Sequence, residues 1–98
     1  VNAASDANNS FYINIDAEPQ APTMIWDIPI TAGFEVRWVS WRGDGTDVSN
    51  QFVPKIFTLT QGQHQILIRG REVDTELQSM KVLQLPTPPL GLKVIAVP

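Results

Sequence analysis

The sequence predicts an all-β protein built as an antiparallel β-sandwich, and three observations support this class. Short stretches alternate apolar and polar residues with a period of two, most clearly in residues 10–16 and 64–69. Turn-forming residues, including 6 glycines and 8 prolines, separate these stretches. No stretch shows the periodicity of an amphipathic helix, so the apolar faces are expected to pack as sheets.

The length of 98 residues fits one domain with a core between two layers. Residues 1–9 are small and polar, so we expect a loose linker there. Residues 10–85 are then the β-sandwich domain. Residues 86–89 are mainly proline and predict a semi-rigid spacer. Residues 90–98 form either a last strand of this domain or the start of a next module, since they resemble the first strand of a fibronectin type III domain.

The first strand is predicted at residues 10–16, where apolar and polar side chains point to opposite faces. The apolar set is Phe11, Ile13 and Ile15, and the polar set is Tyr12, Asn14 and Asp16. Residues 17–22 carry two prolines and predict a loop. Residues 24–30 are apolar, but Pro29 cannot donate a ladder hydrogen bond, so only a short or edge strand is expected there.

A second clear strand is predicted at residues 34–41. Val36 and Trp38 share one face and Val39 and Trp41 share the other. This pattern fits a strand that is partly covered on both sides. The polar, turn-rich residues after it predict the longest loop of the domain, over residues 42–51.

A hairpin at residues 57–72 organises the second half of the chain. Its first arm is apolar and β-branched, Gly62 permits a tight turn, and residues 64–69 form an alternating second arm. Arg71 and Glu72 end the hairpin and are interpreted as a structural pair that fixes the following turn.

A closing strand is predicted after the hairpin, at residues 77–85. Its apolar residues Met80 and Val82 are expected to face inward, with Leu85 as an open third candidate. With this strand, every predicted element is a strand or a loop.

The hairpin also carries a family resemblance. The residues that carry it are Leu59, Gly62, His64, Ile66 and Ile68, followed by Arg71 and Glu72. They resemble the penultimate hairpin of the galactose-binding-like jelly-roll sandwiches, a group that includes the carbohydrate-binding modules of families 6 and 35. The strand at residues 10–16 is similar to another strand of these sandwiches. The resemblance implies a jelly-roll topology, with His64 bonded to the backbone beside the turn.

The chain departs from this family at positions tied to calcium. The family's structural calcium uses an acidic motif on an extra first strand and an aspartate in the closing strand. Residues 1–8 do not supply the motif, and Gln78 stands in place of the aspartate. Asp74, which replaces a glycine of the family pattern, is a further departure outside the calcium positions. Calcium prefers several charged oxygens, so we expect no cofactor, with calcium left as an open alternative.

Composition argues against several functions. The formal charge is −3 and the 7 basic residues are scattered singly, which argues against a nucleic-acid partner. The chain has no cysteine, which excludes disulfides and thiolate metal sites. No apolar run is long enough to span a bilayer, so no membrane insertion is expected. We expect an accessory module that is secreted or at the cell surface, beside neighbouring domains of the same polypeptide.

No residue pattern points to catalysis. His64 is the only histidine, and no serine or cysteine motif accompanies it. Asp44 and Asp47 are acids at loop spacing, as are the acids of residues 72–76. Nothing places two carboxylates across a cleft, as glycosidases require. The chain is therefore predicted to be no enzyme, and at most a non-catalytic module of a larger one.

Polysaccharide binding is the main positive prediction. A sugar ring needs an aromatic surface for its C–H side and polar groups for its hydroxyls. Trp38 lies mid-strand and is expected in the core, whereas Trp26 and Trp41 are the tryptophans expected to be exposed. The candidate ligand-binding residues are Trp26, Trp41, Tyr12, Arg42, Asp44, Asp47 and Asn50.

The alternative is a structural or cell-adhesion module with no sugar ligand. Arg42, Gly43 and Asp44 form an integrin-binding tripeptide in a predicted loop, although glycine and aspartate are also common turn formers. Exposure of Trp26 and Trp41 on one face beside polar groups would favour sugar binding. Their burial would favour the structural role.

Overall fold

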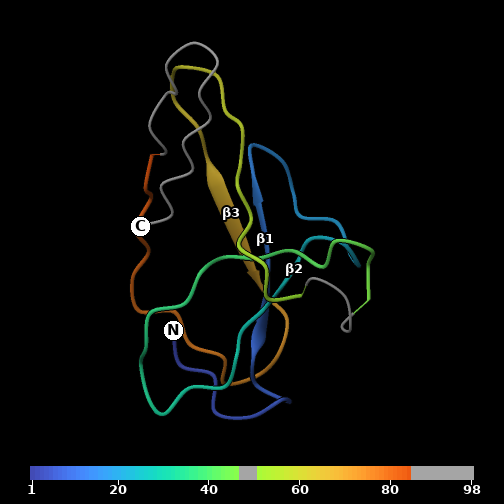
Figure 1. The fold of residues 1–98 in the computed structure, drawn as a ribbon, viewed down its shortest axis with the longest axis vertical. Coiled ribbons are helices and arrows are strands. Elements are labelled where there is room, and N and C mark those ends of the chain that lie inside the picture. The colour runs from blue at the N-terminus through green and yellow to red at the C-terminus, as the bar shows by residue number, and fades with distance from the viewer. Residues whose placement is uncertain (47–50, 85–98) are drawn as a thin grey trace.

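The computed structural model describes residues 1–46 and 51–84, which contain three strands and no helix (Figure 1). The strands are β1 (Ser10–Ile15), β2 (Ile25–Asp27) and β3 (Ile66–Gly70). They form one antiparallel sheet in the order β2-β1-β3. The described chain is therefore all-β, as predicted.

Strand β1 lies at the centre of the sheet, and its register decides which side chains share a face. Phe11 stands opposite Trp26 on one side and Gly70 on the other, and Ile13 stands opposite Ile68. Because alternate residues of a strand share a face, these apolar side chains gather on one side of the sheet. Phe11 and Ile13 are buried, so the inward direction predicted for them is confirmed.

The opposite face of β1 is less open than the alternation predicts. Asn14 is buried although it belongs to the polar set, and Tyr12 is half-buried. Ile25, the partner of Tyr12 in β2, is buried as well. The short strand β2 lies at one edge of the sheet, which confirms the prediction of a short or edge strand in residues 24–30.

The hydrophobic core lies on the inward face of the sheet. Its buried members are Ala3, Phe11, Ile13, Trp26 and Ile28, with Val1, Val39, Trp41, Ile68 and Met80 packed against them. The rings of Phe11 and Trp26 are tilted, with their centroids 5.8 Å apart. Burial of one large apolar side chain stabilises the fold by about 1.5–3 kcal/mol, so this cluster accounts for much of the packing.

Residues 34–41 do not form the predicted strand. Only Ser40 makes a ladder contact, an isolated bridge with Pro54, and Val36 is 91% exposed. The backbone groups of the segment have other partners: Val1 and Glu35 exchange two hydrogen bonds, and the carbonyl of Trp38 accepts the indole N–H of Trp26. Because these backbone groups bond to Val1 and Trp26 and not to a neighbouring strand, the segment does not form a strand despite its alternating pattern.

The hairpin is found in part. Gly62 has a φ of 131°, as the predicted turn requires, and the second arm is strand β3. The first arm is not a strand, and β3 pairs with β1 instead. In Figure 1 the segment before β3 runs to the upper end of the molecule and the chain then returns as β3.

The closing strand is also not formed over residues 77–84, the part of it that the structure describes. Met80 packs against the core as predicted, but Val82 is 73% exposed, so its predicted inward direction is wrong. The last residue of the predicted strand, and the spacer and final segment at residues 86–98, lie outside the described residues.

Residues 1–9 are attached to the body of the molecule rather than loose. Asn2 and Glu76 exchange two backbone hydrogen bonds, Ala3 is fully buried, and its carbonyl accepts the backbone N–H of Thr31. The small side chain of Ala3 is what allows the chain to enter the core here, because a larger residue would not fit a fully buried position without rearrangement. The polar composition therefore gave the wrong expectation for this segment.

Candidate functional site

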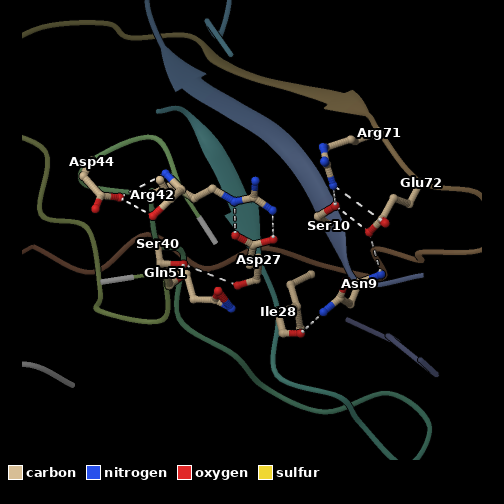
Figure 2. Close-up of polar contacts among 11 residues, drawn as sticks. Asn9, Ser10, Asp27, Ile28, Ser40, Arg42, Asp44, Gln51, Arg71 and Glu72 are labelled. Carbon is tan, nitrogen blue, oxygen red and sulfur yellow. Dashed lines mark hydrogen bonds and ion pairs between the residues drawn. The ribbon is translucent and has the colours of Figure 1, made fainter. Parts of the chain in front are cut away.

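A polar hollow of about 400 Å³ lies at one end of the sheet. The lining residues that the structure describes are all polar: Asp6, Asn9, Asp27, Arg42, Gln51, Arg71 and Glu72. Figure 2 shows all of them except Asp6. We call this site the polar hollow.

The sheet register explains why these residues meet. Asn9 directly precedes β1, Asp27 is the last residue of β2, and Arg71 and Glu72 directly follow β3. In the antiparallel order β2-β1-β3, the start of β1 lies beside the ends of both neighbours. Strand-end residues that are far apart in sequence are therefore brought to one end of the sheet.

One wall of the polar hollow is a two-pronged ion pair between Asp27 and Arg42. Nε and Nη2 of Arg42 donate to Oδ2 and Oδ1 of Asp27 at 2.5 and 2.8 Å. The side chain of Asp27 is 5% exposed, and that of Arg42 is 13% exposed. Ser40 supports this wall, because its hydroxyl donates to the carbonyl of Gln51 at 2.5 Å and lies 3.4 Å from that of Asp27. Such a planar pair fixes the arginine in one orientation.

The opposite wall joins the end of β3 to the start of β1. Oε1 of Glu72 accepts the backbone N–H of Asn9 at 3.1 Å and the hydroxyl of Ser10 at 2.6 Å. Nη1 of Arg71 donates to Oγ of Ser10 at 2.7 Å and lies 3.7 Å from Oε2 of Glu72. Figure 2 shows these contacts beside the amide of Asn9, which donates to the carbonyl of Ile28. Arg71 and Glu72 thus hold the start of β1.

Several polar atoms of the hollow have no partner within the described part of the chain. The carboxylate of Asp6 makes no hydrogen bond or ion pair there, and Oδ1 of Asn9 accepts none. Oε1 of Gln51 is buried without a donor. Nε and Nη2 of Arg71 donate to no described group. The hollow therefore offers both donors and acceptors to a ligand.

The tryptophans are placed differently from the prediction. Trp26, expected to be exposed, is 2% exposed, and its indole N–H donates to the carbonyl of Trp38 at 3.0 Å. Trp38, expected in the core, is 43% exposed. The register of strand β2 explains the burial of Trp26, because it places this residue opposite Phe11 on the inward face of the sheet.

Trp41 is half-buried rather than open. Its indole N–H donates to the carbonyl of Ile13 at 2.9 Å, and its ring meets that of Phe57 edge-on at 5.2 Å. Nζ of Lys55 lies 4.6 Å from the centroid of the Trp41 ring. A lysine in this position makes a cation–π contact and occupies a ring surface that a sugar would need.

Among the residues that the structure describes, the other predicted ligand-binding residues do not all line the polar hollow. Arg42 lines the polar hollow, whereas Tyr12 is half-buried on β1. Asp44 is exposed, and its Oδ1 accepts the backbone N–H and the hydroxyl of Thr46. These bonds, the backbone one first, lower the pKa of Asp44. Asp47 and Asn50 lie outside the described residues.

Most residues of the hollow were missed because they are unremarkable in sequence. The missed residues are Asp6, Asn9, Asp27 and Gln51, while Arg71 and Glu72 were given only a structural role. A signal did exist: polar residues stand next to the ends of three predicted strands. It could be used only once the strand order was known.

A second polar cluster joins the turn before β3 to the end of β1. Nδ1 of His64 lies 2.5 Å from Oδ2 of Asp16, and its Nε2 lies 2.5 Å from the carbonyl oxygen of Thr60. Oδ1 of Asp16 accepts the backbone N–H of Gln65 at 2.8 Å. His64 thus does bond the backbone beside the turn, as the family resemblance implied. Both ring nitrogens face acceptors, so the doubly protonated ring satisfies both contacts.

This cluster predicts a pH dependence of stability. Hydrogen bonds to Asp16 and Thr60 raise the pKa of His64 above 6.5, so its stabilising contribution is full below that value and is lost as pH rises through the raised pKa. The backbone N–H of Gln65, followed by His64, lowers the pKa of Asp16 below 3.8, so its contribution holds above that value and is lost in stronger acid. The cluster is therefore most stabilising between about pH 4 and 6.5.

Urea unfolding followed by tryptophan fluorescence checks this expectation. We expect the urea concentration at the unfolding midpoint of the wild-type chain to decrease as the pH rises from about 6 to about 9. The midpoint of His64→Gln should change less over the same range. Parallel profiles for the two proteins would show that the His64 contacts do not stabilise the fold.

Comparison with known proteins gives no further guide. No protein-family model, curated protein or solved structure matches the chain. Within residues 1–46 and 51–84, no three histidine, aspartate or glutamate side chains are grouped to hold a metal ion. In the same residues no helix is long and apolar enough to cross a membrane. The fold and the site thus define an all-β chain with a polar hollow at one end of its sheet.

Proposed function

We propose that the chain is a non-catalytic polysaccharide-binding accessory module of a larger secreted or cell-surface protein, folded as a β-sandwich of jelly-roll type. The polar hollow is the proposed binding site. The observation that carries the proposal is the set of unpaired donors and acceptors around it, chiefly the carboxylate of Asp6 and the outer nitrogens of Arg71.

The chemistry of the hollow suits a hydroxyl-rich ligand. Each sugar hydroxyl both donates and accepts, and a hydroxyl buried without partners costs about 1–3 kcal/mol. Arg71 supplies donors, and Asp6 and Asn9 supply acceptors. The volume of about 400 Å³ is within the range of small-molecule sites, while the polar lining disfavours an apolar ligand.

The proposed mode of binding differs from the stacking that the sequence predicts. Trp26 is buried, and the described lining of the hollow contains no aromatic residue. Trp38 is the most exposed tryptophan among the described residues and is the one available for stacking outside the hollow. Hydrogen bonding in the hollow, rather than stacking on Trp26 and Trp41, is therefore the basis of the proposal.

A structural module that docks against neighbouring domains is the second candidate. It is favoured by the exposed apolar side chains of Phe34, Val36 and Trp38, which lie within five residues of one another. Cell adhesion through the integrin-binding tripeptide has less support. The guanidinium of Arg42 is held by Asp27 and is mostly buried, so it is not presented to a partner.

Two arginine variants test the polysaccharide proposal. Arg71→Gln removes the donors that face the hollow, and we expect it to weaken glycan binding at least about tenfold, the typical effect of losing a charged hydrogen bond. Arg69→Gln is the matched control, because Arg69 lies on β3 and pairs with Glu18 outside the hollow. Its affinity should match that of the wild-type chain.

Binding is measured by titration calorimetry against neutral, acidic and amino-sugar oligosaccharides. Circular dichroism of each variant checks that the fold is retained. Wild-type protein that binds none of the glycans would overturn the proposal and leave the structural module as the better candidate. Equal losses in the two arginine variants would remove the polar hollow as the binding site.

A further inference from the structure

We infer that the polar hollow selects sugars that carry a protonated amine, such as glucosamine units, over neutral and acidic sugars. This inference rests on the proposed function and names the class of glycan that the site takes. It follows from the charge of the hollow, from its excess of unpaired acceptors, and from the way its arginines are already engaged.

The described groups of the hollow carry a negative charge. Three carboxylates and two guanidinium groups of the described residues line it, which gives these groups a formal charge of −1. Arg42 neutralises Asp27, and Arg71 lies beside Glu72, so the remaining charge belongs to Asp6. Asp6 is exposed and has no cationic partner in the described part of the chain. An acidic sugar would meet this carboxylate as a like charge, while an ammonium group would meet it as a partner.

The hydrogen-bonding groups lead to the same ligand. An ammonium group donates three hydrogen bonds and accepts none. Four acceptors of the hollow take no hydrogen bond in the described chain: the Asp6 carboxylate, Oδ1 of Asn9, Oε2 of Glu72 and the buried Oε1 of Gln51. The unused nitrogens of Arg71 remain for the hydroxyls and ring oxygen of the same sugar.

A metal ion fits this negative site less well than an amine. The oxygens of Asp27 are held by Arg42, and Oε1 of Glu72 accepts two hydrogen bonds. Among the described carboxylates of the lining, the Asp6 carboxylate and Oε2 of Glu72, which lies 3.7 Å from Nη1 of Arg71, are left to act as ligands, whereas divalent cations such as calcium take several more oxygen ligands. A single ammonium needs only one carboxylate and a few neutral acceptors.

The test compares oligosaccharides of glucose-type sugars that differ in the charge of their substituents. Oligomers of glucosamine, N-acetylglucosamine and glucuronate are titrated calorimetrically at a slightly acidic pH, where the amine is protonated. We expect the glucosamine oligomer to bind the wild-type chain at least about tenfold more tightly than the acetylated one. Added salt should reduce this preference, because the contact is between charges near the surface.

Asp6→Asn tests the residue itself, and Glu76→Gln is its control. Each variant removes one negative charge, but Glu76 lies outside the hollow, where its Oε1 accepts the amide of Asn2, a bond that glutamine can keep. Asp6→Asn should abolish the preference for glucosamine, and Glu76→Gln should retain it. This comparison separates a specific contact from general attraction to an acidic protein.

The outcomes distinguish this inference from the proposed function. Equal affinity for the three oligomers, or a preference that survives in Asp6→Asn, would overturn the amine selection while polysaccharide binding stands. Failure of the wild-type chain to bind any oligomer would overturn both. Unchanged circular dichroism in both variants shows that they report on binding and not on folding.

Discussion

Replacing Trp26 with alanine should lower the free energy of unfolding by about 3–5 kcal/mol, whereas Trp38→Ala should lower it by less than about 1 kcal/mol. Trp26 is 2% exposed and contacts Phe11 in the centre of the core. Its loss leaves a cavity and removes the donor to the carbonyl of Trp38. Trp38 is 43% exposed, so truncation of its side chain removes far less packing.

Urea unfolding followed by circular dichroism measures both variants without relying on the deleted tryptophan. Trp26→Phe provides a milder case in the event that Trp26→Ala does not fold. It keeps most of the ring but loses the indole N–H, and we expect a loss of about 1–3 kcal/mol. Equal destabilisation by Trp26→Ala and Trp38→Ala would contradict the placement of the two side chains.

The exchange between Trp26 and Trp38 shows what the sequence pattern could predict. The period-two alternation at residues 10–16 located β1 and its inward residues, because that strand has one strongly apolar face. At residues 34–41 the alternation was imperfect, and apolar residues stood on both faces. Such a pattern does not indicate which face of the segment is buried. In the structure, the position of the segment is fixed by backbone hydrogen bonds to Val1 and to the indole of Trp26.

The pairing of the strands was harder to predict than their existence. The turn at Gly62 and the second arm of the hairpin were predicted correctly, and sequence neighbours are the usual strand partners. Here β3 pairs with β1, more than fifty residues away along the chain. Local sequence indicates turn geometry and strand propensity, but it does not indicate which distant strand a segment pairs with or in which register.

The candidate site could not be predicted for the same reason. The polar hollow depends on contacts across long separations: Ser10 with Glu72 and Arg71, and Asp27 with Arg42. Of the predicted ligand-binding residues that the structure describes, Arg42 alone lines it. Aromatic residues attracted the prediction because stacking is a known mode of sugar binding, yet the unpaired polar atoms lie elsewhere. A site made of strand ends becomes visible only with the strand order.

Breaking the ion pair between Asp27 and Arg42 is the second change with a large expected effect. Arg42→Met should lower the free energy of unfolding by about 2–4 kcal/mol, because it leaves the carboxylate of Asp27 buried without its main partner. Arg69→Met breaks an exposed ion pair with Glu18 and is the matched control. Its effect should be much smaller, since solvent screens exposed charges and keeps the remaining carboxylate hydrated.

A double-mutant cycle separates the ion pair from the packing of the arginine side chain. Asp27→Asn combined with Arg42→Met removes both charges, so the double variant should be more stable than the sum of the two single losses predicts, by about 1–3 kcal/mol. Urea unfolding of all four proteins at neutral pH gives this coupling energy. A coupling near zero would mean that Asp27 and Arg42 do not stabilise each other. In that case the wall they form would not be a fixed part of the polar hollow, and Arg42 would be able to rotate toward a ligand or toward the partner of an adhesion motif.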